Sequence, residues 1–292
     1  MSNVPDTAHE NVETEPAALR RARLVVAYDG SGFHGFAEAD ATPTVMGELR
    51  AAMERVLRVP LTLVGAGRTD AGVHAWGQVV SGDLPADADL ERLRNRLNKL
   101  LGPQIAVRSA EWCDDPAFDA RFSAQWRHYR YEVWNAPVLP PALIGRVWHL
   151  REPLHLWAMQ LGCDPLIGEH DFSSFCRKPK VDEGHTPPSM RRRVMLARWS
   201  EIETDWAPAP LRGSGSERPV DGGLAQPGLL RFEIRANAFC HQMVRSIVGT
   251  LVDVGLGRRH AGELRGILLA QDRVAAGQVA PPAGLTLWSV GY

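Results

Sequence analysis

Residues 65–78 of this 292-residue chain read GAGRTDAGVHAWGQ, and this segment indicates how the sequence around it folds. An apolar run over residues 61–64 leads into it, and Val79 and Val80 follow it. The pattern predicts a strand, a glycine-rich loop that holds Asp70, and a second strand. A carboxylate on such a loop lies at the rim of a sheet, where a substrate can reach it.

Asp70 has two interpretations at this point. Aspartate and glycine are common turn formers, and an aspartate carboxylate often bonds its own backbone in an Asx turn. Arg68 and Thr69 are not typical turn residues, and His74 adds a second polar group, so the segment favours a chemical role. A dinucleotide-binding loop is excluded, because the third glycine position of G-x-G-x-x-G holds Asp70.

Composition is that of a soluble globular protein. Hydrophobic residues make up 45% of the chain and charged residues 23%, and the length suits one large or two modest domains. No apolar stretch is long enough to span a bilayer, and the polar, acidic start does not resemble a secretory signal. We therefore expect residues 1–20 to form a disordered tail and the protein to be cytoplasmic.

Cysteine and histidine spacing argues against a metal site. The four cysteines, Cys113, Cys163, Cys176 and Cys240, include no Cys-x-x-Cys pair. Their spacing argues against a zinc site and a redox dithiol, and it suits a reducing compartment. The ten histidines form no His-Glu-x-x-His motif. The sequence therefore predicts no bound metal.

The formal net charge is −1, whereas RNA-binding proteins usually carry excess base. The charge is unevenly distributed, because acidic residues gather in the first 15 residues. Basic residues gather in three clusters, at 121–130, 177–180 and 191–193. Such local clusters are enough to hold a phosphate backbone, although each one taken alone is equally compatible with a solvated surface.

Hydrophobic periodicity predicts the remaining elements. Strands are predicted over residues 23–28, 105–112, 127–134, 229–236 and 285–290. Helices are predicted over residues 44–57, 89–101, 154–161, 238–254 and 263–270. We expect Thr44 to be the N-cap of the first helix. Residues 207–228 hold much Pro, Gly and Ser, and we expect a mobile insertion there. This order of elements predicts an α/β or α+β layer with helices packed on one face of a sheet, and of the two we expect α+β.

Two further segments hold candidate site residues. Strand alternation over residues 127–133 puts Tyr129 and Tyr131 on one face, and for Tyr131 the core is the favoured place. In the predicted helix over residues 238–254, His241 and Arg245 lie opposite an apolar stripe. Spacing alone does not distinguish Arg245 from a solvent-facing arginine.

The order and wording of these motifs closely resemble the tRNA pseudouridine synthases of the TruA type. The matching segments are GRTDAGVH at 67–74, RHYRYEV at 127–133 and FCHQMVRSIVG at 239–249. YDGS at 28–31, GEHDFSSF at 168–175 and the C-terminal strand extend the resemblance from Arg23 to Tyr292. The sequence departs at Phe36, Ala37 and Met46, where the family usually has Trp, Gln and Gln.

The resemblance implies a role for each matched residue. Asp70 would be the catalytic residue, Tyr129 would pack against the target uracil, and Arg245 would pair with the Asp70 carboxylate and fix its direction. An arginine at that distance stabilises the charged carboxylate. Arg68, beside the acid, would fill the gap left by the extruded uridine or hold the flanking phosphate, and the alternative for it is an ordinary surface arginine. His74 joins the substrate-binding residues as support for the loop.

The resemblance also implies a fold and a reaction. Two similar sheet-and-helix domains of the pseudouridine synthase fold, residues 21–120 and 121–292, would surround a central basic cleft. The substrate would be the anticodon stem-loop of tRNA at uridines 38 to 40, held across both subunits of a homodimer. Isomerising uridine exchanges no electrons and adds no atoms, so no cofactor or metal is expected. An RNA-binding module of the same fold without catalysis is the alternative, and the joint presence of Asp70, Tyr129 and Arg245 argues against it.

Overall fold

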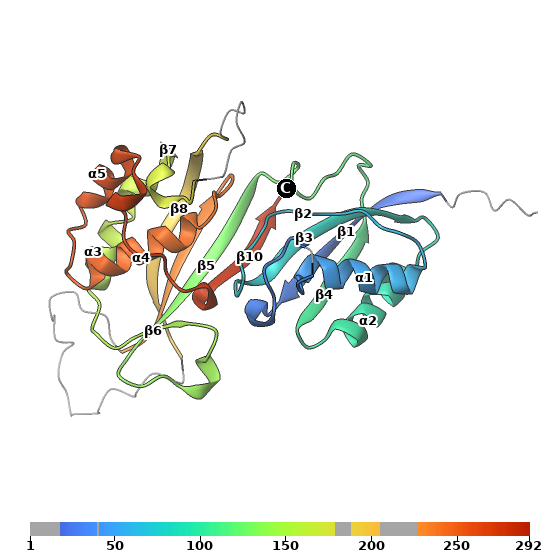
Figure 1. The fold of residues 1–292 in the computed structure, drawn as a ribbon, viewed down its shortest axis with the longest axis horizontal. Helices are drawn as coiled ribbons and strands as arrows, with labels where there is room; N and C mark the ends of the chain where they lie inside the picture. Colours follow the sequence, from blue (N-terminus) through green and yellow to red (C-terminus); the bar gives the residue numbers. More distant parts are fainter. Residues whose placement is uncertain (1–17, 40, 179–187, 205–226) are drawn as a thin grey trace, which may run out of the picture.

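The computed structural model describes residues 18–39, 41–178, 188–204 and 227–292 (Figure 1). Its strands are β1 (Leu19–Tyr28), β2 (Leu63–Gly65), β3 (His74–Pro85), β4 (Ile105–Trp112), β5 (Trp126–Asn135), β6 (Trp148–Leu150), β7 (Gly168–Asp171), β8 (Arg191–Ile202), β9 (Gly228–Ala236) and β10 (Leu285–Gly291). They form one sheet in the order β4-β1-β3-β10-β5-β9-β8-β7, with β2 paired to β3 and β6 to β5. The fold is α+β, as predicted.

The helices are α1 (Val45–Leu57), α2 (Leu90–Leu101), α3 (Leu156–Leu161), α4 (Met243–Gly255) and α5 (Glu263–Ala270). In Figure 1, α1 and α2 lie beside the β1–β3 half of the sheet and α4 beside the β5–β9 half. Buried side chains from both halves, among them Leu24, Leu93 and Ile247, belong to one hydrophobic cluster. None of the helices in the described ranges is long and apolar enough to cross a membrane.

Local sequence signals account for the helices of the first half. The Thr44 side chain accepts a hydrogen bond from the Gly47 N–H, which confirms it as the N-cap of α1. In α2, the residues Leu90, Leu93 and Leu97 lie on one face of the helix and are buried, as their apolar spacing predicts. The helix ends at Gly102, whose N–H donates to the Asn98 carbonyl.

The position of β10 brings the two halves of the chain together. This last strand is parallel to β3, where Leu287 pairs with Ala75, and antiparallel to β5, where Leu287 pairs with Tyr129. Figure 1 shows the red β10 beside the green β5. The loop between β2 and β3, which holds Asp70, is therefore placed next to the start of β5.

Several boundaries differ from those predicted. β1 begins at Leu19, so residues 19 and 20 belong to a strand and not to the tail, because their backbone pairs with the end of β3. Residues 1–17 of the predicted tail and 207–226 of the predicted insertion lie outside the described residues. Gly228, placed in the insertion, is the first residue of β9.

The predicted helix over residues 238–254 begins five residues late. Gln242 has φ +63°, a left-handed conformation that cannot continue a helix, so α4 starts at Met243. Strand β8 was not predicted. That strand opens with three arginines, and a register shift between Val194 and Leu196 interrupts the alternation of buried residues.

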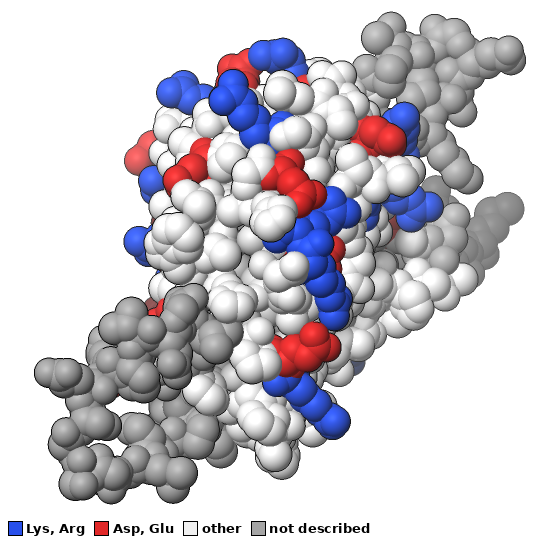
Figure 2. Space-filling view, turned by 90° about the vertical axis from the view of Figure 1, so that its left-hand side faces the viewer, with Lys and Arg blue, Asp and Glu red and all other residues white. Residues whose placement is uncertain are grey.

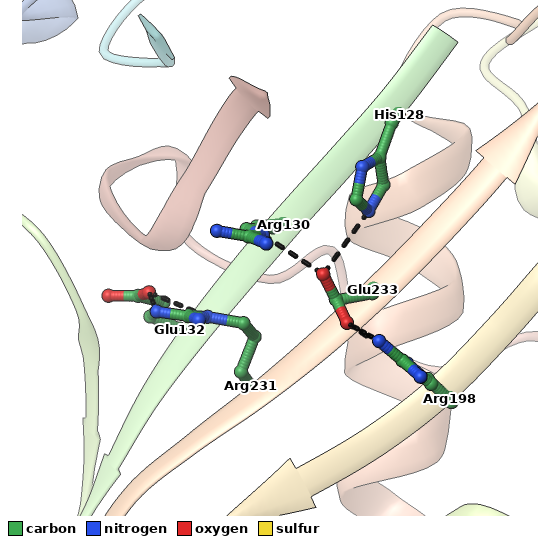
Figure 3. A network of polar contacts seen from close by, with 6 residues as sticks. All are labelled: His128, Arg130, Glu132, Arg198, Arg231 and Glu233. Carbon is green, nitrogen blue, oxygen red and sulfur yellow. Dashed lines mark hydrogen bonds and ion pairs between the residues drawn. The ribbon is translucent and has the colours of Figure 1, made fainter. Parts of the chain in front are cut away.

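The face of the sheet away from α4 carries a network of charged side chains (Figure 3). Buried Glu233 accepts hydrogen bonds from Arg130 at 3.0 Å and Arg198 at 2.9 Å, and Arg231 pairs with Glu132. Burial alone would raise the pKa of Glu233, but the hydrogen bonds from the two arginines outweigh it and lower that pKa. The two faces of the sheet therefore differ, one packed under helices and one polar.

Candidate active site

A cavity of about 780 Å³ lies between the loop that follows β2 and the start of α4. Its described lining contains a single acidic side chain, Asp70. The basic side chains of the lining are His34, Arg68, Arg121, Arg127, Arg192, His241 and Arg245. A concave site with this excess of positive charge attracts polyanions.

The loop that holds Asp70 is fixed by hydrogen bonds to its backbone and to the Thr69 hydroxyl. The Gly67 carbonyl accepts a hydrogen bond from the buried Gln78 amide at 2.8 Å, and the Thr69 carbonyl accepts one from the Phe36 N–H at 3.1 Å. The hydroxyls of Thr69 and Tyr28 are hydrogen-bonded at 2.7 Å. Phe36, one of the departures from the family pattern, thus takes part in holding the loop through its main chain.

The Asp70 carboxylate is held by side chains from the other half of the chain. Arg245 Nη1 lies 2.9 Å from Asp70 Oδ2, and His241 Nε2 lies 3.3 Å from Asp70 Oδ1. Arg245 is itself oriented, because its Nε donates to the Ala280 carbonyl at 2.7 Å. The Asp70 side chain is 25% exposed, and no described backbone N–H donates to it. This geometry differs from the Asx turn that was the alternative for this residue.

Tyr129 lines the same cavity from β5 and is 7% exposed. Its ring packs edge-on against Phe239, with the ring centroids 4.9 Å apart. Burial raises the pKa of the Tyr129 phenol, so the hydroxyl stays protonated at neutral pH. Tyr131 is fully buried and donates its hydroxyl hydrogen bond to the Pro281 carbonyl, which confirms it as a core residue.

The two remaining predicted residues occupy different places. Arg68 is exposed, lines the cavity, and forms no hydrogen bond or ion pair with any described residue. His74 is 5% exposed and is not part of the cavity lining. Its Nδ1 lies 3.1 Å from the Gly30 nitrogen and 3.2 Å from Asp29 Oδ1, and its Nε2 lies 3.0 Å from the Gly145 carbonyl oxygen. The structure therefore brings Asp70, Arg68, Tyr129 and Arg245 together, and it holds His74 outside the cavity, against two backbone groups and the Asp29 carboxylate.

Known proteins resemble this chain both in the half that holds Asp70 and in the half that holds Arg245. A family model described as tRNA pseudouridine synthase matches residues 24–123 and 163–292. This chain belongs to the tRNA pseudouridine synthase family. It is 39% identical to tRNA pseudouridine synthase A of Brevibacillus brevis, over 94% of this chain and 100% of the relative. It is 37% identical to the protein of that name from Cutibacterium acnes, over 94% of this chain and 89% of the relative.

Two cavity residues of this family member were not predicted as site residues. His241 falls in the predicted helix, but the left-handed Gln242 places it in the turn before α4, where it contacts Asp70. Helical spacing does not account for this contact, because His241 lies before the first residue of α4. Arg127 donates to the Ala66 carbonyl at 2.8 Å and to the Asn237 carbonyl at 2.8 Å. It thus links the residues just before the Asp70 loop to the segment before α4, a contact that no local pattern predicts.

Proposed function

We propose that this protein isomerises uridines 38 to 40 in the anticodon stem-loop of tRNA, with Asp70 as the catalytic residue. Family membership supplies the reaction, the conversion of uridine in tRNA to pseudouridine. The observation that carries the role of Asp70 is its carboxylate, which Arg245 and His241 orient and which is still a quarter exposed, in a cavity whose other charged side chains are basic.

The proposed chemistry needs an oriented carboxylate and room for a nucleotide. The target uridine leaves its stack and enters the cavity, where the Tyr129 ring packs against the uracil. Asp70 then acts either as a nucleophile at the anomeric carbon or as a base at the adjacent sugar carbon. The bond from N1 to the sugar breaks, the base rotates, and it is rejoined through C5. Atoms and electrons balance without a cofactor.

The charge distribution supports an RNA contact centred on the cavity. The end of the molecule that carries α3 and α5 shows basic and acidic side chains interspersed (Figure 2). The cavity lining, by contrast, holds one acid among many bases. Because affinity for RNA follows the phosphates contacted and not the net charge, a chain of net charge −1 can bind tRNA through this site.

We further propose that the protein acts in the cytoplasm as a homodimer of two-domain subunits, divided at residue 120. The polar face of the sheet supports self-association. There Trp76, 45% exposed, stacks on Trp288, and Arg108 and Arg130 lie over these two rings at 4.1 and 3.8 Å. Exposed tryptophan and arginine are enriched at protein interfaces. Light scattering of the purified protein measures the mass, and a monomer at assay concentrations would contradict the dimer.

The proposed function is tested with an unmodified tRNA transcript. After incubation with the protein alone, chemical mapping should find pseudouridine at positions 38, 39 or 40 of substrates that carry uridine there. Transcripts in which those uridines are replaced by cytidine are the control and should yield no pseudouridine. Product only at other tRNA positions would contradict the proposed site while leaving the reaction intact.

Tyr129→Phe is expected to preserve tRNA binding. No described residue forms a hydrogen bond with the Tyr129 hydroxyl, so its removal leaves the ring and its packing against Phe239 intact. Tyr129→Leu removes the ring and should lower kcat/KM by the equivalent of about 1–3 kcal/mol. Steady-state kinetics and tRNA binding of both variants check this. A large binding loss in Tyr129→Phe would show that the hydroxyl, and not the ring, makes the contact.

Arg68→Ala is expected to weaken tRNA binding in a salt-dependent way. The exposed guanidinium has no protein partner in the described residues, so it is free to contact a phosphate. Losing one such contact should reduce the slope of log affinity against log salt by about 1. Arg265→Ala on α5, an exposed arginine outside the cavity, is the matched control. An unchanged slope in Arg68→Ala would exclude a phosphate contact.

A further inference from the structure

Two cysteines that are far apart in the sequence meet beside the cavity. The Arg177 N–H donates to the His241 carbonyl at 3.0 Å, which places the segments ending in Cys176 and beginning at Cys240 next to each other. The two thiols interact with one another, the Cys240 thiol also donates to the Met190 carbonyl at 3.9 Å, and both cysteines are free. Sequence spacing argued against a redox dithiol because no Cys-x-x-Cys pair exists. The fold supplies a pair that spacing does not reveal.

The two thiols differ in access and in acidity. Cys240 is partly exposed and lines the cavity, whereas Cys176 is 1% exposed behind it. The hydrogen bond from Cys176 lowers the pKa of Cys240, and the positive charge of Arg192 acts in the same direction. The thiolate is the nucleophilic form of cysteine. A small oxidant that enters the cavity therefore meets the more acidic thiol first, with a second thiol in contact behind it.

We propose that Cys176 and Cys240 are a peroxide-reactive pair that closes into a reversible disulfide in the wall of the catalytic cavity. The Cys240 thiolate attacks one oxygen of a hydroperoxide, which gives a sulfenic acid and releases the other oxygen as water or an alcohol. The Cys176 sulfur then attacks the sulfenic sulfur, the S–S bond forms, and water leaves. A dithiol reductant restores both thiols by exchange.

The disulfide would displace the residues on either side of Cys240, which are Phe239 and His241. Phe239 packs on the ring of Tyr129, and His241 lies 3.3 Å from the Asp70 carboxylate. Drawing Cys240 into a covalent bond with Cys176 shifts both neighbours relative to the catalytic loop. Displacements of about an ångström at such positions can cost orders of magnitude in rate. Oxidation is therefore expected to lower turnover, a consequence that rests on the proposed function.

The chemical half of the proposal is tested without an activity assay. The full-length protein is treated with hydrogen peroxide and digested without reduction, and its peptides are identified by mass spectrometry. The expected result is a Cys176–Cys240 cross-linked peptide and the loss of two of the four free thiols. In Cys176→Ala the cross-link should be absent and Cys240 should be trapped as a sulfenic acid by dimedone. Cys113→Ala is the matched control and should cross-link as the wild type does.

Circular dichroism establishes that each variant is folded before it is interpreted. Four free thiols after peroxide treatment, or a cross-link through Cys113 or Cys163, would overturn the assignment of the pair.

The effect of the disulfide on activity is tested by comparing kcat on tRNA before oxidation, after it, and after dithiothreitol. A roughly tenfold fall in kcat on oxidation, restored by dithiothreitol, supports the expected effect of the disulfide on turnover. Unchanged kcat in fully cross-linked protein would overturn it. Inactive reduced protein would count against the proposed function and leave the disulfide standing.

Discussion

Asp70→Asn should abolish pseudouridine formation while leaving tRNA binding at least as tight as in the wild type. The amide has the size and shape of the carboxylate, but it can act neither as a nucleophile nor as a base, so we expect turnover to fall by at least about 10³-fold. Binding should not weaken, because the substitution removes the single acidic side chain from the described lining of a basic cavity. Pseudouridine mapping measures turnover, and fluorescence anisotropy of labelled tRNA measures binding.

The matched control for Asp70→Asn is Asp83→Asn. Asp83 also pairs with an arginine, Arg21, at 2.7 Å, but it lies on β3 outside the cavity lining. This variant should retain wild-type turnover. Asp70→Ala provides a second test of the catalytic role, because alanine lacks any group that can hydrolyse back to a carboxylate. Substantial residual turnover in Asp70→Ala would remove Asp70 from the reaction, whichever of the two chemical routes is followed.

The parts of the site that are local in sequence were predictable. The loop around Asp70 is flagged by glycines on both sides and by apolar strands before and after it. Period-two alternation put Tyr129 and Tyr131 on the same face of β5, and both are buried there. The resemblance paired Arg245 with Asp70 across the chain, and the structure places their side-chain atoms 2.9 Å apart. In each case a short pattern determines a backbone conformation or matches a known motif.

The parts that depend on nonlocal pairing were not predictable from the patterns. The insertion of β10 between β3 and β5 follows from strand pairing across the whole chain, and no local period indicates it. His241 reaches Asp70 because Gln242 adopts a left-handed conformation, which glutamine seldom does and which no sequence signal announced. The meeting of Cys176 with Cys240 is nonlocal in the same way.

Arg245→Lys should lower kcat by roughly 10²-fold with a smaller effect on tRNA binding. The guanidinium makes two directed contacts at once: Nη1 binds the Asp70 carboxylate at 2.9 Å, and Nε donates to the Ala280 carbonyl at 2.7 Å. Lysine keeps the positive charge but has one compact ammonium group, which cannot span both acceptors in this geometry. The carboxylate then keeps a cation nearby and loses its fixed direction. The measurement is single-turnover kinetics at saturating enzyme, which separates the chemical step from binding.

A matched control distinguishes this loss of direction from a general loss of stability. Arg231→Lys on β9 also weakens a partly buried arginine–carboxylate pair, with Glu132 on the polar face of the sheet. Both variants lose comparable contacts, so thermal melts should show similar, modest destabilisation, whereas only Arg245→Lys should lose turnover. Equal kcat in the wild type and Arg245→Lys would mean that charge alone suffices at this position. The orientation of Asp70 would then depend on His241 and the loop backbone, and His241→Ala would be the variant that loses the chemical step.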